Sequence, residues 1–152
     1  MRHGKNMTKL GRPAEARKAL FSSMVGNLIE EQRIKTTVVK AKQTRVAAEK
    51  LVTTAKRALA AGKPEALLQG KRKALAALRH RKPMEKLFTV IAPLYKDRAG
   101  GYTRITKLGR RSSDSSEMAL LEWVDMAPAR AAARAAKAEA AEKAAAAATK
   151  KD

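Results

Sequence analysis

Few side chains in this sequence have the types and spacing that catalysis requires. There are two histidines, His3 and His80, and no cysteine, which excludes disulfides, thiolate zinc sites and cysteine nucleophiles. Glu30 and Glu31 are adjacent, so on a helix they diverge by about 100° and do not form a carboxylate pair. A GxxxxGK[ST] phosphate loop is also missing. We therefore expect that the chain is not an enzyme and needs no cofactor.

The first three residues allow one more specific hypothesis. A free amino terminus followed by a histidine at position three can bind Cu²⁺ or Ni²⁺ through four nitrogens in a square plane. Met1, Arg2 and His3 have this layout. Spacing is its only support, and a histidine that contacts a phosphate or a base is the simpler interpretation. We expect no resident metal, and unchanged Cu²⁺ uptake by His3→Ala would exclude this hypothesis.

Positive charge is the dominant chemical feature. The chain has 34 Lys and Arg against 14 Asp and Glu, a formal net charge of +20, and residues 19–126 alone hold 22 against 10. Residues 71–82, KRKALAALRHRK, contain six basic residues and no acid, and residues 96–111 contain six with Asp97 as the one acid. Solvated surfaces normally mix both signs. Several unmixed runs therefore favour phosphate binding, and their spread favours a protein embedded in nucleic acid.

The scarcity of aromatic residues indicates which kind of nucleic acid is bound. Phe21 and Phe88 lie on apolar stripes and Trp123 lies in an apolar strand pattern, so we expect all three in the core. Tyr95 and Tyr102 are left outside it, too few for a platform on which single-stranded bases stack. Contacts to the backbone and shape of folded RNA suit this composition best.

These charges need elements to position them, and apolar periodicity predicts an α+β fold. Helical spacing and strand alternation replace one another along the chain. In chain order we expect helix 13–31, strand 33–39, a helix from Lys40 to Gly62, a helix that opens at Pro64 and is weakened by Gly70, a helix from Pro83 with Pro93 near its end, and strands 102–108 and 117–125. Leu67, Leu68, Leu75 and Leu78 indicate the helix after Pro64. The last strand is expected to be buried and to pair with its neighbour as a hairpin. The small, mostly antiparallel sheet then packs on helices.

Composition divides the chain into three parts. Residues 1–12 form a basic arm; no apolar run suited to a signal peptide follows it, and it lacks transit-peptide composition, so we assign it to the mature protein. Residues 13–126 form the RNA-binding core. Residues 127–152 are an Ala/Lys/Glu-rich tail, helical or disordered, with no large apolar residue to dock it. We expect the arm to order on RNA, and deletion of the tail to leave assembly nearly intact.

Several motifs together resemble the bacterial large-subunit ribosomal protein seventeen family. They are MRH at the start, Gly26-Asn27-Leu28, RIKTT followed by KAK, RAGGYTRI, and EWVD. The resemblance covers about residues 1–126, and RAGGYTRI is its most specific piece. Within that motif, Gly100 and Gly101 permit either a turn with positive φ or a close approach of backbone to phosphate. Residues 60–82 and the long tail depart from the shorter family members.

The resemblance implies a structural, non-catalytic constituent of the large ribosomal subunit. The family binds the long ribosomal RNA on the solvent side near the peptide exit, beside other ribosomal proteins, so the expected location is the cytoplasm, in the ribosome. The residues expected to contact RNA are Arg2, His3, Lys5, Lys9, Arg12, Lys35, Thr36, Lys40, Lys42, Arg98, Gly100, Gly101, Tyr102 and Arg104. A nucleoid-type protein that binds and compacts DNA is the alternative, because a basic Ala/Lys tail is typical of that class.

Overall fold

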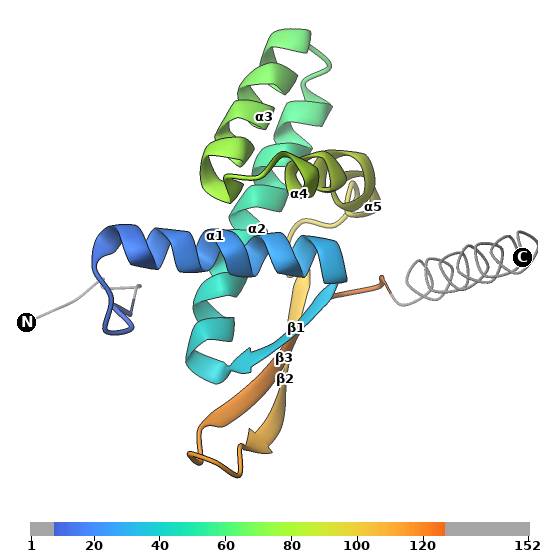
Figure 1. Ribbon diagram of the computed structural model, residues 1–152. Coiled ribbons are helices and arrows are strands. Elements are labelled where there is room, and N and C mark those ends of the chain that lie inside the picture. The colour runs from blue at the N-terminus through green and yellow to red at the C-terminus, as the bar shows by residue number, and fades with distance from the viewer. Residues whose placement is uncertain (1–7, 127–152) are drawn as a thin grey trace, which may run out of the picture.

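The computed structural model of this chain describes residues 8–126 (Figure 1). Its elements are α1 (Ala14–Glu31), β1 (Arg33–Thr37), α2 (Val38–Ala60), α3 (Pro64–Leu78), α4 (Arg81–Lys86), η1 (Leu87–Ile91), α5 (Ala92–Leu94), β2 (Thr103–Arg110) and β3 (Glu117–Trp123). The predicted α+β class is confirmed. The predicted tail and residues 1–7 of the predicted arm lie outside the described residues. Across residues 8–126, none of the helices is both long and apolar enough to cross a membrane.

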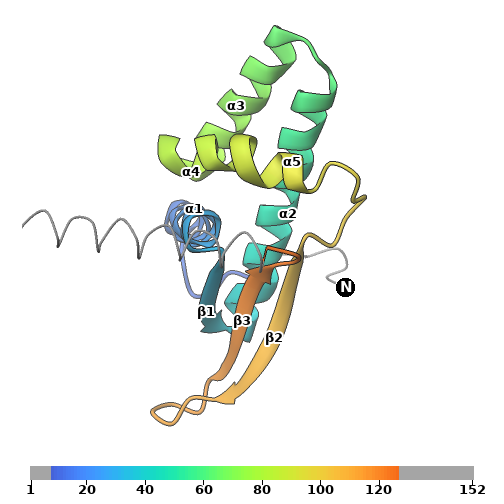
Figure 2. The same cartoon turned by 90° about the vertical axis from the view of Figure 1, so that its right-hand side faces the viewer.

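The three strands form one antiparallel sheet in the order β1-β3-β2. Ile34 of β1, Leu121 of β3 and Ile105 of β2 are aligned across the strands, and all three side chains pack into the core. α2 contacts every strand, and α1 lies against β1 (Figure 2). Successive strand residues point to opposite faces, so the alternate side chains point to the other face of the sheet. Among residues 8–126, no helix covers that face.

Helix α1 begins and ends close to the predicted limits. Pro13 is its N-cap and Gln32, with a φ of 66°, ends it. Val25, Leu28 and Ile29 are buried as predicted, but the buried face also includes Ser22 and Gly26. The reason is tertiary, because the Ser22 hydroxyl donates a 2.7 Å hydrogen bond to the Leu78 carbonyl and Pro83 packs over Gly26.

The junction between β1 and α2 differs from the prediction. β1 ends at Thr37, two residues early, and α2 begins at Val38 rather than at Lys40. Val38 and Val39 continue a β-branched run that favours a strand locally. Val38 is nonetheless buried in the first turn of α2 and belongs to the core. Tertiary burial therefore decides the local conformation here.

Gly70 has a packing role that its helix propensity does not reveal. It lies in α3, where a Cβ built on it would come within 2.4 Å of the Ala58 Cβ in α2. α2 and α3 thus approach closely at this point, which only a residue without a side chain allows. The prediction that Gly70 would weaken the helix considered helix propensity alone. In the structure, α3 continues past Gly70 to Leu78.

The last helical segment starts at Arg81 and runs through α4, η1 and α5 to Leu94. Pro83 lies in its first turn, where a missing N–H group breaks no helical hydrogen bond. Pro93 follows the π-helical stretch η1, in which Ala92 N–H donates to the Leu87 carbonyl five residues earlier. A proline ring clashes with the carbonyl four residues before it, which explains why the helix widens there.

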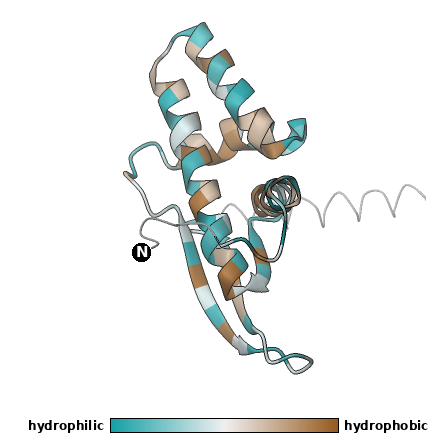
Figure 3. Ribbon diagram, turned by 90° about the vertical axis from the view of Figure 1, so that its left-hand side faces the viewer, coloured by the Kyte–Doolittle hydropathy of each residue, from teal (hydrophilic) through white to brown (hydrophobic). Residues whose placement is uncertain are grey.

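The two predicted strands after this helix form the predicted hairpin. β2 and β3 are antiparallel, with a bulge between Lys107 and Gly109. β3 is buried on one face rather than throughout, because Ala119, Leu121 and Trp123 point inward and the residues between them do not. Figure 3 shows hydrophobic colour on the helices and at intervals along the strands.

Candidate nucleic-acid interface

The basic residues predicted around the first strand lie together. Lys35, Thr36 and Lys40 line a hollow of about 400 Å³ between α1 and β1, which Asn27 and Glu31 also line. The Lys35 side chain is exposed, and Thr36 and Lys40 are half-buried. The turn from β1 into α2 therefore presents two ammonium groups and a hydroxyl to one region of surface. Lys42, the fourth predicted member of this group, is exposed on α2 outside that lining.

The uncovered face of the sheet connects this group to Arg104. Arg33, Glu122 and Arg104 are aligned in one row across the three strands, and Lys35 lies in the next row beside Leu120. Arg33, Lys35 and Arg104 are exposed. One flat surface thus carries three cations and one carboxylate, an arrangement suited to a polyanion.

Arg33 was not among the predicted contacts. The signal that could have found it is the two-residue spacing from Lys35 to Arg33, which places both on one face of a strand. Arg104 lies in the same row across the sheet. That position depends on strand order and register, which the sequence did not specify.

The loop before β2 is held by the protein itself. Arg98 Nη1 forms a 2.7 Å ion pair with Asp125, and its Nε donates to the Gly100 carbonyl at 3.2 Å. Gly101 has a φ of 63°, as the turn interpretation requires, and an added Cβ at either glycine would meet no atom within 4 Å. The backbone of Gly100 and Gly101 is exposed. The loop therefore offers a pre-shaped open backbone, while Arg98 is partly committed to Asp125.

The interpretation of the two tyrosines needs correction. Tyr95 and Tyr102 are each only 2% exposed and belong to the core. Their rings lie 5.2 Å apart between centroids, and the Tyr95 ring lies 6.2 Å from that of Trp123. Tyr95 follows the end of the predicted helix, where no apolar spacing applies, and alternation in the predicted strand 102–108 places Tyr102 on the same face as Arg104. In the structure, β2 begins only at Thr103. The ring of Tyr102 therefore offers no surface for stacking on a base.

This aromatic cluster fixes the glycine loop. Lys56 Nζ lies 5.2 Å above the Tyr102 ring and donates hydrogen bonds to the Tyr102 hydroxyl, at 3.3 Å, and to the Arg98 carbonyl. The Tyr95 hydroxyl donates to the Val124 carbonyl. Burial, followed by the charge of Asp125, raises the pKa of Tyr95 to about 12. Tyr102 thus positions the exposed backbone that precedes it, and its own ring is not available to a ligand.

The predicted arm is described only at its end. Arg2, His3 and Lys5 lie outside the described residues, as does the metal hypothesis for His3. Lys9 and Arg12 are exposed and belong to one turn, in which Arg12 N–H donates to the Lys9 carbonyl at 3.1 Å. In the part of the chain that the structure describes, no group of three or more His, Asp or Glu is placed to hold a metal ion.

A second basic region comes from three separate helices. Arg17 and Lys18 of α1, Lys50 of α2 and Arg79 at the end of α3 surround a hollow of about 520 Å³ whose apolar floor includes Phe21. Only Arg79 belongs to the basic run that the sequence highlighted. The others were missed as a group because they are far apart in the sequence and meet only through helix packing.

Comparisons with known proteins agree with the motifs. Residues 20–124 match the family model described as Ribosomal protein L17. The large ribosomal subunit protein bL17 of Cereibacter sphaeroides (strain ATCC 17025) is 45% identical over 128 residues, covering 84% of this chain and 86% of that protein. The proteins of the same name from Ruegeria pomeroyi and Rhodopseudomonas palustris (strain TIE-1) are each 47% identical over 125 residues, covering 82% of this chain and 84% of theirs.

Proposed function

The chain belongs to the ribosomal protein L17 family, and from this premise we propose that it is built into the large ribosomal subunit, where it binds and neutralises the large-subunit ribosomal RNA. It is a structural ribosomal protein and not an enzyme. Its partners are RNA and, at the margins, neighbouring ribosomal proteins. The proposal concerns where this chain's own residues touch the RNA and how the fold makes those contacts selective.

The uncovered face of the sheet is the observation that carries the proposal. A small antiparallel sheet usually exposes mixed polar residues on its free face. Here the free face carries Arg33, Lys35 and Arg104, while helices occupy the opposite face. Between residues 19 and 126, 22 basic residues stand against 10 acids, so intrachain ion pairs leave a large positive excess. Folding therefore places these three cations, with Glu122 between Arg33 and Arg104, on one surface suited to a polyanion.

Two further groups extend this surface. Lys35, Thr36 and Lys40 supply donors from the hollow beside β1, with Lys42 further along α2. The backbone of Gly100 and Gly101 supplies N–H groups at the other edge of the sheet, because β3 separates β1 from β2. These contacts position the protein on phosphates and sugars and carry no base-specific readout.

The complete proposed contact set keeps the residues predicted from the sequence and adds Arg33. It omits the ring of Tyr102, which is buried. Proposed contacts are Lys9, Arg12, Arg33, Lys35, Thr36, Lys40, Lys42, Arg98, Gly100, Gly101 and Arg104, together with Arg2, His3 and Lys5 outside the described residues.

Sedimentation tests this function directly. A tagged copy of the full chain should remain with large subunits when a lysate is centrifuged through high salt, and should be released by ribonuclease rather than by deoxyribonuclease. Affinity of the purified chain for ribosomal RNA should fall roughly a thousandfold from 50 to 200 mM salt if six phosphates are neutralised. Absence from large subunits, with release by deoxyribonuclease, would instead support the DNA-compacting alternative.

A further inference from the structure

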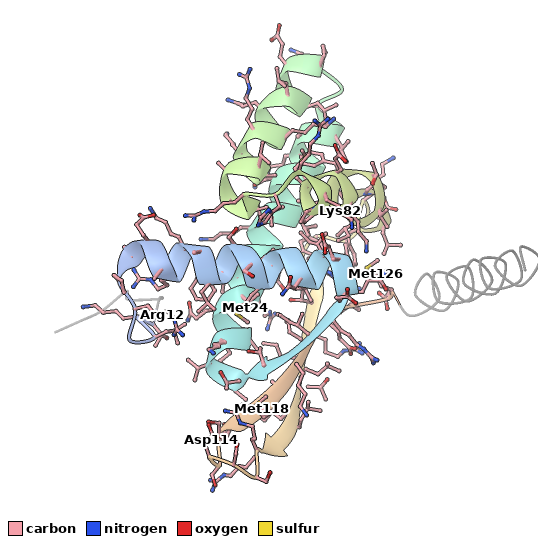
Figure 4. All side chains as sticks on the ribbon, viewed as in Figure 1. Arg12, Met24, Lys82, Asp114, Met118 and Met126 are labelled. Carbon is pink, nitrogen blue, oxygen red and sulfur yellow. The ribbon has the colours of Figure 1, made fainter. Side chains whose placement is uncertain are left out.

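The β2–β3 hairpin extends well beyond the core. Residues 106–115 are all exposed, and burial in the hairpin is confined to its base, at Thr103, Ala119, Leu121 and Trp123. Figure 2 shows the two strands reaching past the helices, and Figure 4 places Asp114 at their far end. A two-stranded ribbon by itself is only marginally stable in water. The extension thus adds little to the core, and its shape calls for another explanation.

The β2–β3 hairpin carries cations on both faces, one where the sheet lies over the core and two further out. Arg104 lies on the uncovered face, opposite Glu122. Lys107 and Arg110 are paired with Ala119 and Glu117, whose side chains belong to the other face. The bulge after Lys107, with Gly109 at a φ of 86°, twists this part of the ribbon. A ribbon that is basic on both faces fits between two phosphate-bearing segments better than against one.

The loop at the tip is tied into one shape around Asp114. Arg111 donates from Nε to Oδ1 at 2.9 Å and from Nη2 to Oδ2 at 2.6 Å. Ser116 donates its backbone N–H to Oδ1 at 3.1 Å and its hydroxyl to Oδ2 at 2.9 Å. Two backbone hydrogen bonds of 2.9 Å, between Arg111 and Ser116 and between Ser115 and Arg111, close the same turn. These donors, Arg111 first, hold the pKa of Asp114 well below its usual range.

Such a network at an exposed site has little value for folding, because water and salt screen exposed ion pairs. It has a clear value for binding. Loop ordering and side-chain immobilisation oppose association, and a loop already held in its bound shape avoids most of that loss. Asp114 uses one edge of the Arg111 guanidinium, which leaves the N–H groups of Nη1 for another acceptor.

We propose that the hairpin enters the ribosomal RNA between two phosphate-bearing segments, one facing Arg104 and the other facing Lys107 and Arg110. Residues 107–116 form its preorganised finger, in which Asp114 is the residue that positions Arg111. The proposal rests on the proposed function, since it specifies how one part of the chain meets the same RNA. One consequence is opposite to the expectation from charge alone: the carboxylate of Asp114 must favour RNA binding although it lies close to phosphates.

The sign of one substitution tests it. On charge alone, Asp114→Asn should tighten binding to RNA. On the proposal, it should weaken binding of the full chain to a transcript of the large-subunit ribosomal RNA from its own source, by about three- to tenfold. Glu117→Gln, on the same hairpin, is the matched control with the same change of charge, and it should bind as tightly as the unchanged chain or more tightly. Binding by Asp114→Asn that equals or exceeds the unchanged chain overturns the proposal.

Salt dependence separates positioning from a general loss of structure. Arg111→Gln should lower the slope of log affinity against log salt by about 1, as loss of one phosphate contact does. Asp114→Asn should lower it similarly although it adds positive charge, and the double variant should be no weaker than Arg111→Gln. Additive effects, or a slope that stays unchanged, contradict the positioning role. If the unchanged chain itself fails to bind the transcript or to enter large subunits, the proposed function fails instead.

Insertion can be located within the particle. The chain has no cysteine, so Ser113→Cys provides one attachment point for an iron chelate that cleaves nearby RNA. In assembled large subunits, the labelled chain should cleave two RNA segments that are separate in the RNA sequence, and unlabelled chain should cleave neither. Intact RNA around labelled particles would show that the tip lies in solvent, and cleavage of a single segment would show that it lies on the RNA surface; either result overturns insertion.

Discussion

The two ends of the β2–β3 hairpin are held by opposite kinds of chemistry. At the base, Trp123 is 4% exposed, packs near Tyr95 and donates a 2.9 Å hydrogen bond from Nε1 to the Leu28 carbonyl of α1. At the tip, Arg111 and Asp114 are about half-exposed and touch no core residue. Buried apolar area provides stability, whereas an exposed polar network provides shape. Along one hairpin, folding and the proposed recognition of RNA are thus assigned to different residues.

The largest effect should come from the base. Trp123→Ala should lower the free energy of unfolding by about 3–5 kcal/mol, because it leaves a cavity and leaves the buried Leu28 carbonyl without its donor. Trp123→Phe keeps most of the ring and should cost about half as much or less. Urea unfolding followed by circular dichroism measures both. A loss below about 1 kcal/mol for Trp123→Ala would mean that the base does not hold the hairpin.

Tyr95 should make the stability contributed by the base of the hairpin depend on alkaline pH. Its pKa is raised to about 12 in the folded protein, against about 10 when unfolded, so the folded state favours the neutral phenol. This contribution is complete below pH 10 and is lost as pH rises toward 12, by about 2 kcal/mol in total. Tyr95→Phe should remove that part of the decline when unfolding is measured from pH 9 to 12. Parallel pH profiles for the two proteins would contradict the assignment.

Between base and tip, the uncovered face of the sheet should affect RNA and not folding. Arg33→Gln and Arg104→Gln should each lower the salt slope of RNA binding by about 1 and leave the urea midpoint unchanged. Lys63→Gln carries the same charge change in the exposed turn between α2 and α3, so it is the matched control. Equal slopes for all three variants would indicate diffuse charge and no defined surface.

The smallest effect on folding should come from the tip. Asp114→Ala should leave the free energy of unfolding unchanged within error, because the ion pair with Arg111 is exposed and screened. The same variant should still weaken RNA binding if the finger is inserted. A clear drop in thermal stability would show that the network at the tip serves folding, and the contrast between the two ends would disappear.

Much of the fold could be predicted because the relevant signals are local. α1 was placed to within a residue and the start of α3 was placed at Pro64, since Pro13, Gly62 and Pro64 mark helix ends and apolar residues between them recur at helical spacing. The hairpin followed from two stretches with strand composition, 102–108 and 117–125. Errors arose where local preference and burial disagree, as at Val38, where a residue follows a helix end, as at Tyr95, and at the first residue of a predicted strand, as at Tyr102.

The candidate site divides in the same way. Net charge, the basic runs and the KTT and AGGYTR motifs predicted RNA as a partner and several of the proposed contacts, because charge and family motifs are read directly from residue types. Arg33 became visible only through strand register, and the grouping of Arg17, Lys50 and Arg79 only through the packing of three helices. The residues of such a set are far apart in the sequence, and no sequence pattern indicates that they lie together in the fold.

By itself, the sequence determined the class of protein, the order of its elements and the sign of its partner. Composition sets the charge, and periodicity sets which face of each helix and strand turns inward. Only the tertiary structure decided that the sheet keeps one face free, that Tyr102 supports the glycine loop from within, and that Asp114 ties the tip of a ribbon beyond the core. The first two features depend on contacts between residues distant in the chain, and the third depends on a set of short-range side-chain contacts whose geometry residue types alone do not specify.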